Sequence, residues 1–419
     1  MNIGYLIQLG EEIRLPPYNG PANHVRQVFL ELARRGHRMR LLIRLDGEIW
    51  KSDDLNLFQP VVVKWVDRGF LRWVEKAVRR VQSALKLPYL GFFESVRFSL
   101  ACRQELKGFE VFLERFSWMN YGGAFASRWY KIPLILEYNG DPLADLEAKG
   151  SAPRGMQLKI AVSLMRWMFQ QAEQVVASGE GWRRSCIERW EVNENRVQTI
   201  ENGSELVHIL KRQQLHAFEA SPDRSCPVRL VYLGGFYPWH GVTVLLHAFS
   251  QAIQQGADLR LTLIGAGAGF DEAIQTAHDL NLESRVTFTG RLGVNEYASY
   301  LAEADVGVSP YCGWEEYSGL KIFDYKAAGL ACLASGKDGQ PVTVSHGDTG
   351  WIVPPCDEVA LCDAILALTS QRDRLQKMGQ AARIEAEQYH GWDHTAGQIE
   401  ETISKALARS GKTSVKVLN

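Results

Sequence analysis

Residues 228–254 have the sequence VRLVYLGGFYPWHGVTVLLHAFSQAIQ. The segment opens with a short, mostly apolar run, continues through a glycine-containing loop, and ends in an amphipathic stretch. A short apolar run predicts a strand buried on both faces of a sheet, and an apolar face at helical spacing predicts a helix. The segment therefore predicts one strand–turn–helix unit of a parallel sheet.

The same pattern recurs along the chain. Further apolar runs lie at 3–9, 39–45, 61–66, 111–116, 134–138, 174–178 and 197–200, and then at 259–264, 286–289, 305–309, 331–334 and 350–353. Helical stretches separate them, so the crossovers between parallel strands should be right-handed. We expect an α/β fold with two facing, doubly wound, Rossmann-like domains. Ligands of such sheets bind outside the carboxyl ends of the strands, which predicts a cleft between the domains.

The break between the two sets of strands is predicted near 206–227. Charged and polar residues at 211–214 and 220–225 have the composition of a linker, and a strong strand begins at Val228. We therefore predict an N-terminal domain at 1–205 and a C-terminal domain at 206–392.

Composition excludes several classes of protein. The chain has 419 residues, 46% of them hydrophobic and 23% charged, as in ordinary globular proteins. Its net charge of −1 predicts no nucleic-acid partner. No apolar run is long enough for a membrane span, and the first residues lack the features of a signal peptide. The seven scattered cysteines indicate no disulfide framework, which favours a cytoplasmic location.

Residues 64–107 depart from this balance. They contain ten basic residues against four acidic ones, with seven aromatic residues interleaved. A basic, aromatic helix can lie on an anionic bilayer, so one interpretation is peripheral contact with the inner face of the cell membrane. The alternative is a solvated helix whose aromatic residues pack inward.

The strongest chemical motif is the stretch EEYSGLKIFDYKAAG at 315–329. Ser318 is a good helix N-cap, Gly319 allows a ligand close to the backbone, and a helix should run from Leu320 to Ala328 and stop at Gly329. A helix start favours phosphate. The carboxylates of Glu316 and Asp324 could each grip sugar hydroxyls. The alternative is a capped helix with a surface acid.

This motif resembles the E-x7-E signature of retaining glycosyltransferases of family 4, which have the GT-B fold. Asp324 replaces the second Glu. Other segments are similar to that family in the same order: Arg35-Gly36-His37, Glu201-Asn202-Gly203, the loop at 233–242, the strand ends at 264–267 and 288–292, and Trp392. The resemblance thus covers most of the chain.

The resemblance implies roles for individual residues. Asp324 would bind the ribose of the donor, Glu316 its sugar, and the backbone of Ser318, Gly319 and Leu320 its diphosphate. The C-terminal domain would bind the nucleotide-sugar donor and the N-terminal domain the acceptor. The helix at about 393–419 would pack back on the N-terminal domain.

Two positions depart from the family pattern. Gly235 stands where an Arg is usual, and His240 stands at or near a usual Lys; both usual residues bind the leaving diphosphate. We expect a protonated His240, together with Lys321 and the helix start, to neutralise that group. The alternative is that His240 only packs beside Trp239.

Further candidates border the cleft. Arg291 follows a donor-domain strand and is expected near the base, or else in a surface ion pair. Gly20, with Pro21, matches a Gly-Gly loop that reaches the donor phosphate in the family. His24, Arg26, Glu114–Ser117 and Glu137–Asp141 are expected on the acceptor side, with Asn139 where many members have a His.

We therefore expect a retaining hexosyltransferase. It would move a sugar from a UDP- or GDP-sugar to a saccharide or lipid-linked acceptor in polysaccharide or glycolipid synthesis. The sequence contains no Asp-x-Asp and no cluster with metal-ligand spacing, so we expect neither a metal nor a cofactor besides the donor. The alternatives are a nucleotide-sugar epimerase of the same fold, a dehydrogenase, and an inactive sugar-binding homologue.

Overall fold

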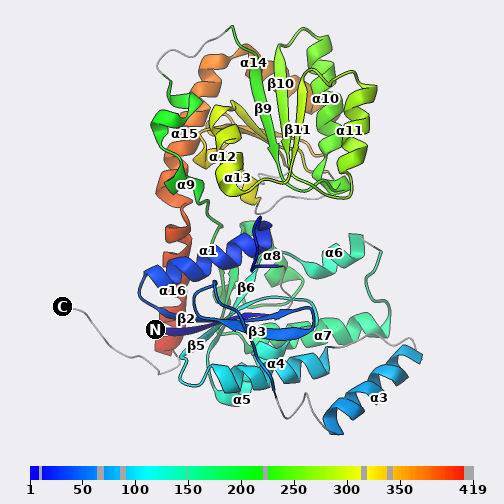
Figure 1. Cartoon of the computed structure of the whole chain (residues 1–419), viewed down its shortest axis with the longest axis vertical. Helices are drawn as coiled ribbons and strands as arrows, with labels where there is room; N and C mark the ends of the chain where they lie inside the picture. Colours follow the sequence, from blue (N-terminus) through cyan, green and yellow to red (C-terminus); the bar gives the residue numbers. More distant parts are fainter. Residues whose placement is uncertain are drawn as a thin grey trace, which may run out of the picture. The chain divides into compact units, whose positions relative to one another are not determined.

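The computed structural model describes residues 1–8, 12–63, 70–84, 91–148, 150–219, 225–312, 319–336 and 343–409. These residues form two α/β units (Figure 1). Unit 1 contains Met1–Glu201 and the chain from Thr395 onward, and unit 2 is Asn202–His394. The boundaries predicted from the sequence were 205/206 and 392/393.

Unit 1 is built on an eight-stranded sheet of order β4-β3-β2-β1-β5-β6-β7-β8. Its strands are β1 (Asn2–Ile7), β2 (Arg38–Leu45), β3 (Glu48–Ser52), β4 (Gln59–Pro60), β5 (Val111–Arg115), β6 (Leu134–Tyr138), β7 (Gln174–Ala177) and β8 (Val197–Thr199). All are parallel except β3 and β4, which pair antiparallel at one edge. The order reverses between β1 and β5, where α/β sheets bind their ligands.

Helices cover both faces of this sheet. They are α1 (Gly20–Arg34), α3 (Phe70–Ala84), α4 (Phe92–Glu105), α5 (Gly122–Tyr130), α6 (Pro142–Ala148), α7 (Met156–Gln171) and α8 (Glu180–Glu188), with a short 3-10 turn at Glu194–Arg196. The long α16 (Trp392–Arg409) belongs to this unit over most of its length. It packs there through the buried Ile399 and Ile403, and Thr402 donates a hydrogen bond of 3.0 Å to Gln198.

The antiparallel edge of unit 1 corrects the prediction of purely parallel sheets. Asp46 and Gly47 both have positive φ, at 52° and 82°, and Leu45 pairs with Glu48 across them. An Asp-Gly pair in this conformation makes a two-residue hairpin turn that reverses the chain. The strand predicted at 61–66 is wrong for residues 61–63, which are in no strand, and 64–66 lie outside the described residues.

Unit 2 is built on a six-stranded parallel sheet of order β11-β10-β9-β12-β13-β14. The strands are β9 (Val228–Leu233), β10 (Leu259–Ile264), β11 (Val286–Gly290), β12 (Val306–Ser309), β13 (Ala331–Ser335) and β14 (Gly350–Val353). The helices are α9 (Leu206–Ile209), α10 (Val242–Gln254), α11 (Phe270–Asp279), α12 (Val294–Glu303), α13 (Leu320–Ala327), α14 (Glu358–Ser370) and α15 (Arg372–Tyr389), with 3-10 turns at Arg212–Gln214, His216–Phe218 and Pro238–His240. Its order reverses between β9 and β12.

Two further observations concern the chain as a whole. Cys312 and Cys356 form a disulfide with Cα atoms 4.7 Å apart, so the prediction of unpaired cysteines is wrong for this pair. The pairing was not visible in the sequence because 44 positions separate the two residues and only the parallel sheet brings the loops after β12 and β14 together.

Within the described residues, no helix has both the length and the apolar composition needed to cross a membrane.

Candidate active site

The carboxyl ends of β9, β10 and β12 converge with the start of α13 in unit 2. Gly319 is the N-cap of α13, in an extended conformation, and Leu320 is the first helical residue. The first N–H groups of a helix have no partner within the helix, so a helix start at the end of the sheet suits a phosphate. Glu316 and Ser318 lie outside the described residues, so their predicted positions stay predictions.

Lys321 is almost fully buried at this helix start. Its Nζ lies 4.9 Å from the ring centre of Tyr232 on β9 and 4.4 Å from that of Tyr311 after β12. Gly234 makes room for it, since a Cβ at that position would lie 3.3 Å from Nζ. The two rings stabilise a buried cation through their π faces. The structure thus brings Lys321 to the end of β9, where the resemblance implies the leaving group.

His240 belongs to the same cluster. Its Nδ1 faces the carbonyl oxygen of Gly235, and its Nε2 lies 3.3 Å from the hydroxyl of Tyr311. A carbonyl only accepts, so Nδ1 carries the proton and Nε2 accepts from Tyr311. Burial, and then the charge of Lys321, lower the pKa of His240 to about 4. The expectation of a protonated His240 is therefore wrong for the ligand-free protein, because burial beside a cation disfavours a second positive charge.

Glycines shape the loop that carries His240. A Cβ at Gly235 would lie 2.8 Å from the ring of Tyr237 and 3.2 Å from that of His240. Gly241 has a φ of 68°, and a Cβ there would overlap the carbonyl oxygen of Pro310. The loop after β9 is thereby pressed against the end of β12, and the amide of Cys312 donates to the carbonyl of Trp239 at 2.8 Å.

Asp324 lies one turn into α13, partly buried. The hydroxyl of Ser204 donates to its Oδ1 at 2.5 Å, and the hydroxyl of Tyr297 on α12 donates to its Oδ2 at 3.2 Å. Desolvation of the carboxyl group raises the pKa of Asp324 to about 7, and the charge of Glu205 acts in the same direction, although both hydroxyls act in the opposite one. Both oxygens already accept from hydroxyl groups, which is the kind of bond that a ribose diol would offer.

Arg291 follows β11 at the same end of the sheet and is exposed. The glycine-rich loop after β10 lies against the loop after β9, which carries His240. The amide of Phe236 donates to Ala266 at 3.1 Å, and a Cβ at Gly265 would overlap the carbonyl oxygen of Gly234. The loops after β9 and β10 therefore form one continuous rim beside Lys321.

The acceptor-side candidates gather in unit 1. Nε2 of His24 on α1 lies 3.1 Å from the carboxyl group of Glu137 on β6 and 3.1 Å from the side-chain amide of Asn139. The hydroxyl of Tyr5 donates to the same carboxyl group of Glu137 at 2.7 Å. The carboxyl of Glu137 is buried, but the partner His24 helps to keep its pKa below the usual range despite burial. The structure thus joins His24, Glu137 and Asn139 at the carboxyl ends of β1 and β6.

Other sequence-predicted residues of unit 1, including Gly20, which was expected at the donor phosphate, make contacts within the unit. Gly20 begins α1, where the side chain of Asn19 caps the amide of Ala22. Arg26 lies 4.2 Å above the ring of Tyr18 and donates to the carbonyl of Ile13. Glu114 accepts from Gln8, and burial raises its pKa to about 8.

Unit 1 also holds a cavity of about 610 Å³ at the carboxyl edge of its sheet. Its walls come from the carboxyl end of β2, from the loop after β5, and from helices α3 and α4. Its charged lining residues are Arg44, Asp46, Arg79, Glu94 and Arg97, and Trp118 adds an aromatic wall. The cavity is large enough for a sugar ring or a lipid headgroup.

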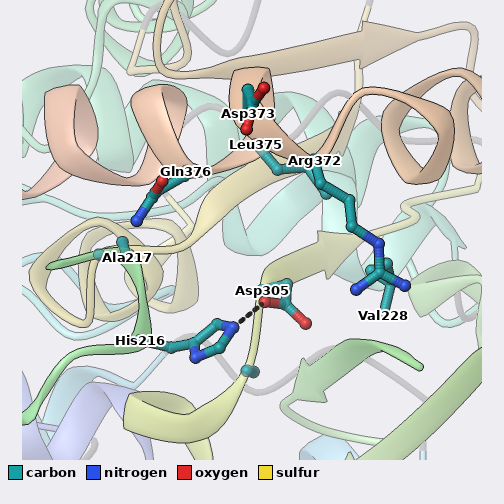
Figure 2. A pocket seen from close by; sticks show the side chains of 10 residues that line it. His216, Ala217, Val228, Asp305, Arg372, Asp373, Leu375 and Gln376 are labelled. Carbon is teal, nitrogen blue, oxygen red and sulfur yellow. Dashed lines mark ion pairs between the residues drawn. The ribbon is translucent and has the colours of Figure 1, made fainter. Parts of the chain in front are cut away.

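A second pocket, shown in Figure 2, lies at the opposite end of the unit 2 sheet. It is lined by Val228, the first residue of β9, and by Asp305, which precedes β12 and pairs with His216 at 3.0 Å. Its volume is about 40 Å³, which is too small for a nucleotide. It therefore does not belong to the candidate site.

Sequence reasoning missed four side chains of the unit 2 site: Tyr232, Tyr311, Ser204 and Tyr297. Tyr232 and Tyr297 lie inside an apolar strand and an amphipathic helix, where they are indistinguishable from core residues. Tyr311 follows the end of β12 directly, and that position is a signal that could have been used. Ser204 follows Asn202-Gly203, a pair typical of a turn, and nothing beside it in the sequence indicates a partner of Asp324.

Comparison with known proteins agrees with this geometry. A glycosyl transferase 4-like domain matches residues 19–203, and a domain of glycosyl transferases group 1 matches residues 227–371. A D-inositol 3-phosphate glycosyltransferase of Nocardia farcinica is 26% identical over 318 residues, which are 73% of this chain and 68% of that protein. A phosphatidyl-myo-inositol mannosyltransferase of Mycobacterium leprae is 28% identical over 56% of this chain and 63% of its own length.

The fold is shared with solved structures. Anabaena HepE, solved in complex with UDP, is 17% identical and superposes with a TM-score of 0.68 over 97% of this chain and all of that chain. The predicted fold of two Rossmann-like domains is thereby confirmed as GT-B. With a 4-like domain followed by a group 1 domain on that fold, the chain belongs to the GT4-type glycosyltransferases.

Proposed function

We propose that the protein transfers a hexose, with retention, from a nucleoside-diphosphate sugar to a saccharide or lipid-linked acceptor in glycolipid or polysaccharide synthesis. One observation carries the proposal: Lys321, His240 and the start of α13 converge at the carboxyl ends of the unit 2 strands, with Asp324 one turn further on. The names of the relatives support it, since they include a phosphatidyl-myo-inositol mannosyltransferase and a protein solved with UDP.

In this proposal unit 2 holds the donor. The backbone of Ser318, Gly319 and Leu320 binds the diphosphate, Asp324 the ribose and Glu316 the sugar, while Gly235 and Arg291 border the nucleotide. Lys321 supplies a fixed positive charge for the leaving group, and Nε2 of His240 accepts a hydrogen bond. Because the protein supplies this charge itself, the reaction needs neither a metal nor a cofactor besides the donor.

The proposed reaction has one chemical step. The bond from the anomeric carbon to the phosphate oxygen breaks, and the acceptor oxygen bonds to that carbon from the same face. The acceptor proton passes to the departing phosphate oxygen, so charge and atoms balance. The acceptor binds in unit 1, near His24 and Asn139, while Gly20 at the first turn of α1 keeps its predicted role at the donor phosphate. We assign the reaction to the cytoplasm; the Cys312–Cys356 disulfide does not support that assignment, because disulfides are rare in a reducing compartment.

The test uses a panel of nucleoside diphosphates in thermal-shift measurements, followed by transfer assays with the sugar nucleotide that binds. We expect UDP or GDP to raise the melting temperature and Glu316→Gln to keep that shift while losing turnover. A sugar nucleotide that is converted without any acceptor would instead indicate an epimerase. If no nucleotide shifts the melting temperature, the proposal is wrong.

A further inference from the structure

Helix α3 turns its charged face toward the protein and its apolar face toward solvent, which is the reverse of an ordinary surface helix. Its charged side chain Glu75 is 6% exposed and makes ion pairs with Arg79 at 2.6 Å and with Arg97 on α4 at 2.8 Å. Arg79 also pairs with Glu94 on α4. These ion pairs tie the polar face of α3 to the body of unit 1.

The apolar face of the same helix points into solvent. Trp73 is 66% exposed, Val81 56% and Val78 37%. At 3.6 residues per turn these three side chains fall within an arc of about 140°, away from Glu75. Figure 1 shows α3 at the periphery of unit 1. The part of unit 1 that the structure describes therefore leaves this face largely open to solvent.

Charge on the helix indicates what covers this face. Lys76 and Arg80 are exposed and lie beside Trp73 on the helix surface. A ring that is apolar in the body and polar at one edge prefers the boundary between water and lipid, and cations beside it are attracted by anionic headgroups. A protein partner would need a complementary groove, whereas a bilayer accepts a narrow apolar arc of this kind directly.

A second group of aromatic side chains is exposed on unit 1, on α4 and α5. Phe92 begins α4, is 52% exposed, and its ring lies 6.3 Å from that of Phe125 on α5. Phe125 stacks on Trp129, which is 49% exposed, at 4.9 Å. This row lies on α4 and α5, so exposed aromatic rings of unit 1 are not confined to α3.

We propose that α3 is an interfacial helix: Trp73, Val78 and Val81 insert into an anionic lipid surface, and Lys76 and Arg80 contact its headgroups. The ion pairs of Glu75 hold the helix in that orientation before it meets the membrane. Within the basic segment 64–107 this assigns the contact to α3; residues 64–69 and 85–90 lie outside the described residues. The docking does not depend on the transferase activity, because it uses none of the site residues.

The test is co-sedimentation of the full chain with vesicles. We expect binding to vesicles of phosphatidylglycerol and phosphatidylcholine, weaker binding to phosphatidylcholine alone, and loss at high salt. Val81→Asp places a charge on the exposed face and should reduce binding about tenfold. Lys76→Glu with Arg80→Glu should remove the preference for anionic lipid.

Val359→Asp on α14 is the matched control. Val359 is similarly exposed, at 64% against 56% for Val81, but it belongs to unit 2. It should bind vesicles as the unchanged chain does, and both Val→Asp variants should keep the same melting temperature and the same nucleotide-induced shift. Equal binding by Val81→Asp and the unchanged chain would overturn the proposal, as would no binding to anionic vesicles. A dimer that Val81→Asp dissociates, with no vesicle binding, would assign the face to a second copy instead.

Discussion

Asp324 couples protonation to both stability and ligand binding. Its pKa is raised to about 7 in the folded protein, above the value of an unfolded aspartate. The folded state therefore binds more protons between pH 4 and 7, and stability falls as the pH rises through that range. Asp324→Asn should remove this dependence, so that the stability of the variant relative to the unchanged chain rises as the pH increases from 4 to 8.

The same substitution should weaken nucleotide binding, because a neutral amide accepts ribose hydroxyls less strongly than a carboxylate. Melting temperatures from pH 4 to 8, with and without the bound nucleoside diphosphate, check both effects. Ser204→Ala is the control, since it removes one partner and leaves the carboxylate. The same change of stability with pH in Asp324→Asn and in the unchanged chain would contradict the raised pKa.

The charge of Lys321 and the pKa of His240 should be linked. The charge of Lys321 contributes to the low pKa of His240, so Lys321→Met should move that pKa upward toward the usual range. An NMR titration of the His240 ring measures it. In the proposed reaction the same variant should lose about 10²–10³-fold in kcat, because a preorganised cation at the leaving group is gone.

Tyr311→Phe serves as the control for this pair. It removes the hydroxyl near Nε2 but keeps the ring beside Lys321, so the pKa of His240 should change little and turnover only modestly. A His240 that titrates near pH 6.5 in the unchanged protein would show that the imidazole is not buried beside the cation as described.

At the scale of an element, the loop after β9 depends on Gly241. Its φ of 68° and the carbonyl of Pro310 leave no space for a Cβ. Gly241→Ala should destabilise unit 2 by about 2–4 kcal/mol through strain and displacement of the loop. Gly256→Ala is the matched control, because its φ is also positive, at 93°, but nothing lies within 4 Å of the added Cβ.

Gly256→Ala should cost about 1 kcal/mol, from backbone conformation alone. Urea unfolding curves of the two variants give the comparison. Equal losses would mean that the contact with Pro310 adds nothing beyond the conformational cost of a positive φ.

The strands show which elements a sequence reveals. Buried parallel strands such as β9 and β10 were predicted closely because a continuous apolar run that is short and bounded by turn residues fits a buried strand better than a helix. Strand β3, EIWKS, carries charge at both its start and its fourth position and lies next to an edge strand, so its apolar signal is weak. The turn at Asp46 and Gly47 was the better indicator of that hairpin.

The residues of the candidate site also fall into a group that the sequence predicts and a group that it does not. Lys321 and Asp324 were predictable because they lie on one short helix with a recognisable spacing. Their partners Tyr232, Tyr297 and Tyr311 come from three other elements, and only the folded sheet brings them together. The state of His240 also depends on burial, which a sequence alone does not give.

At the scale of the whole molecule, unit 2 is a single uninterrupted segment whose two ends meet. Ser204 bridges to Gly391, its amide donates to His390 at 2.8 Å, and a Cβ at Gly203 would lie 2.7 Å from the amide of Trp392. Segments with adjoining ends behave as insertions and commonly fold by themselves. Residues 202–394 should therefore be separable as a stand-alone nucleotide receptor, in which donor recognition is studied without any acceptor machinery.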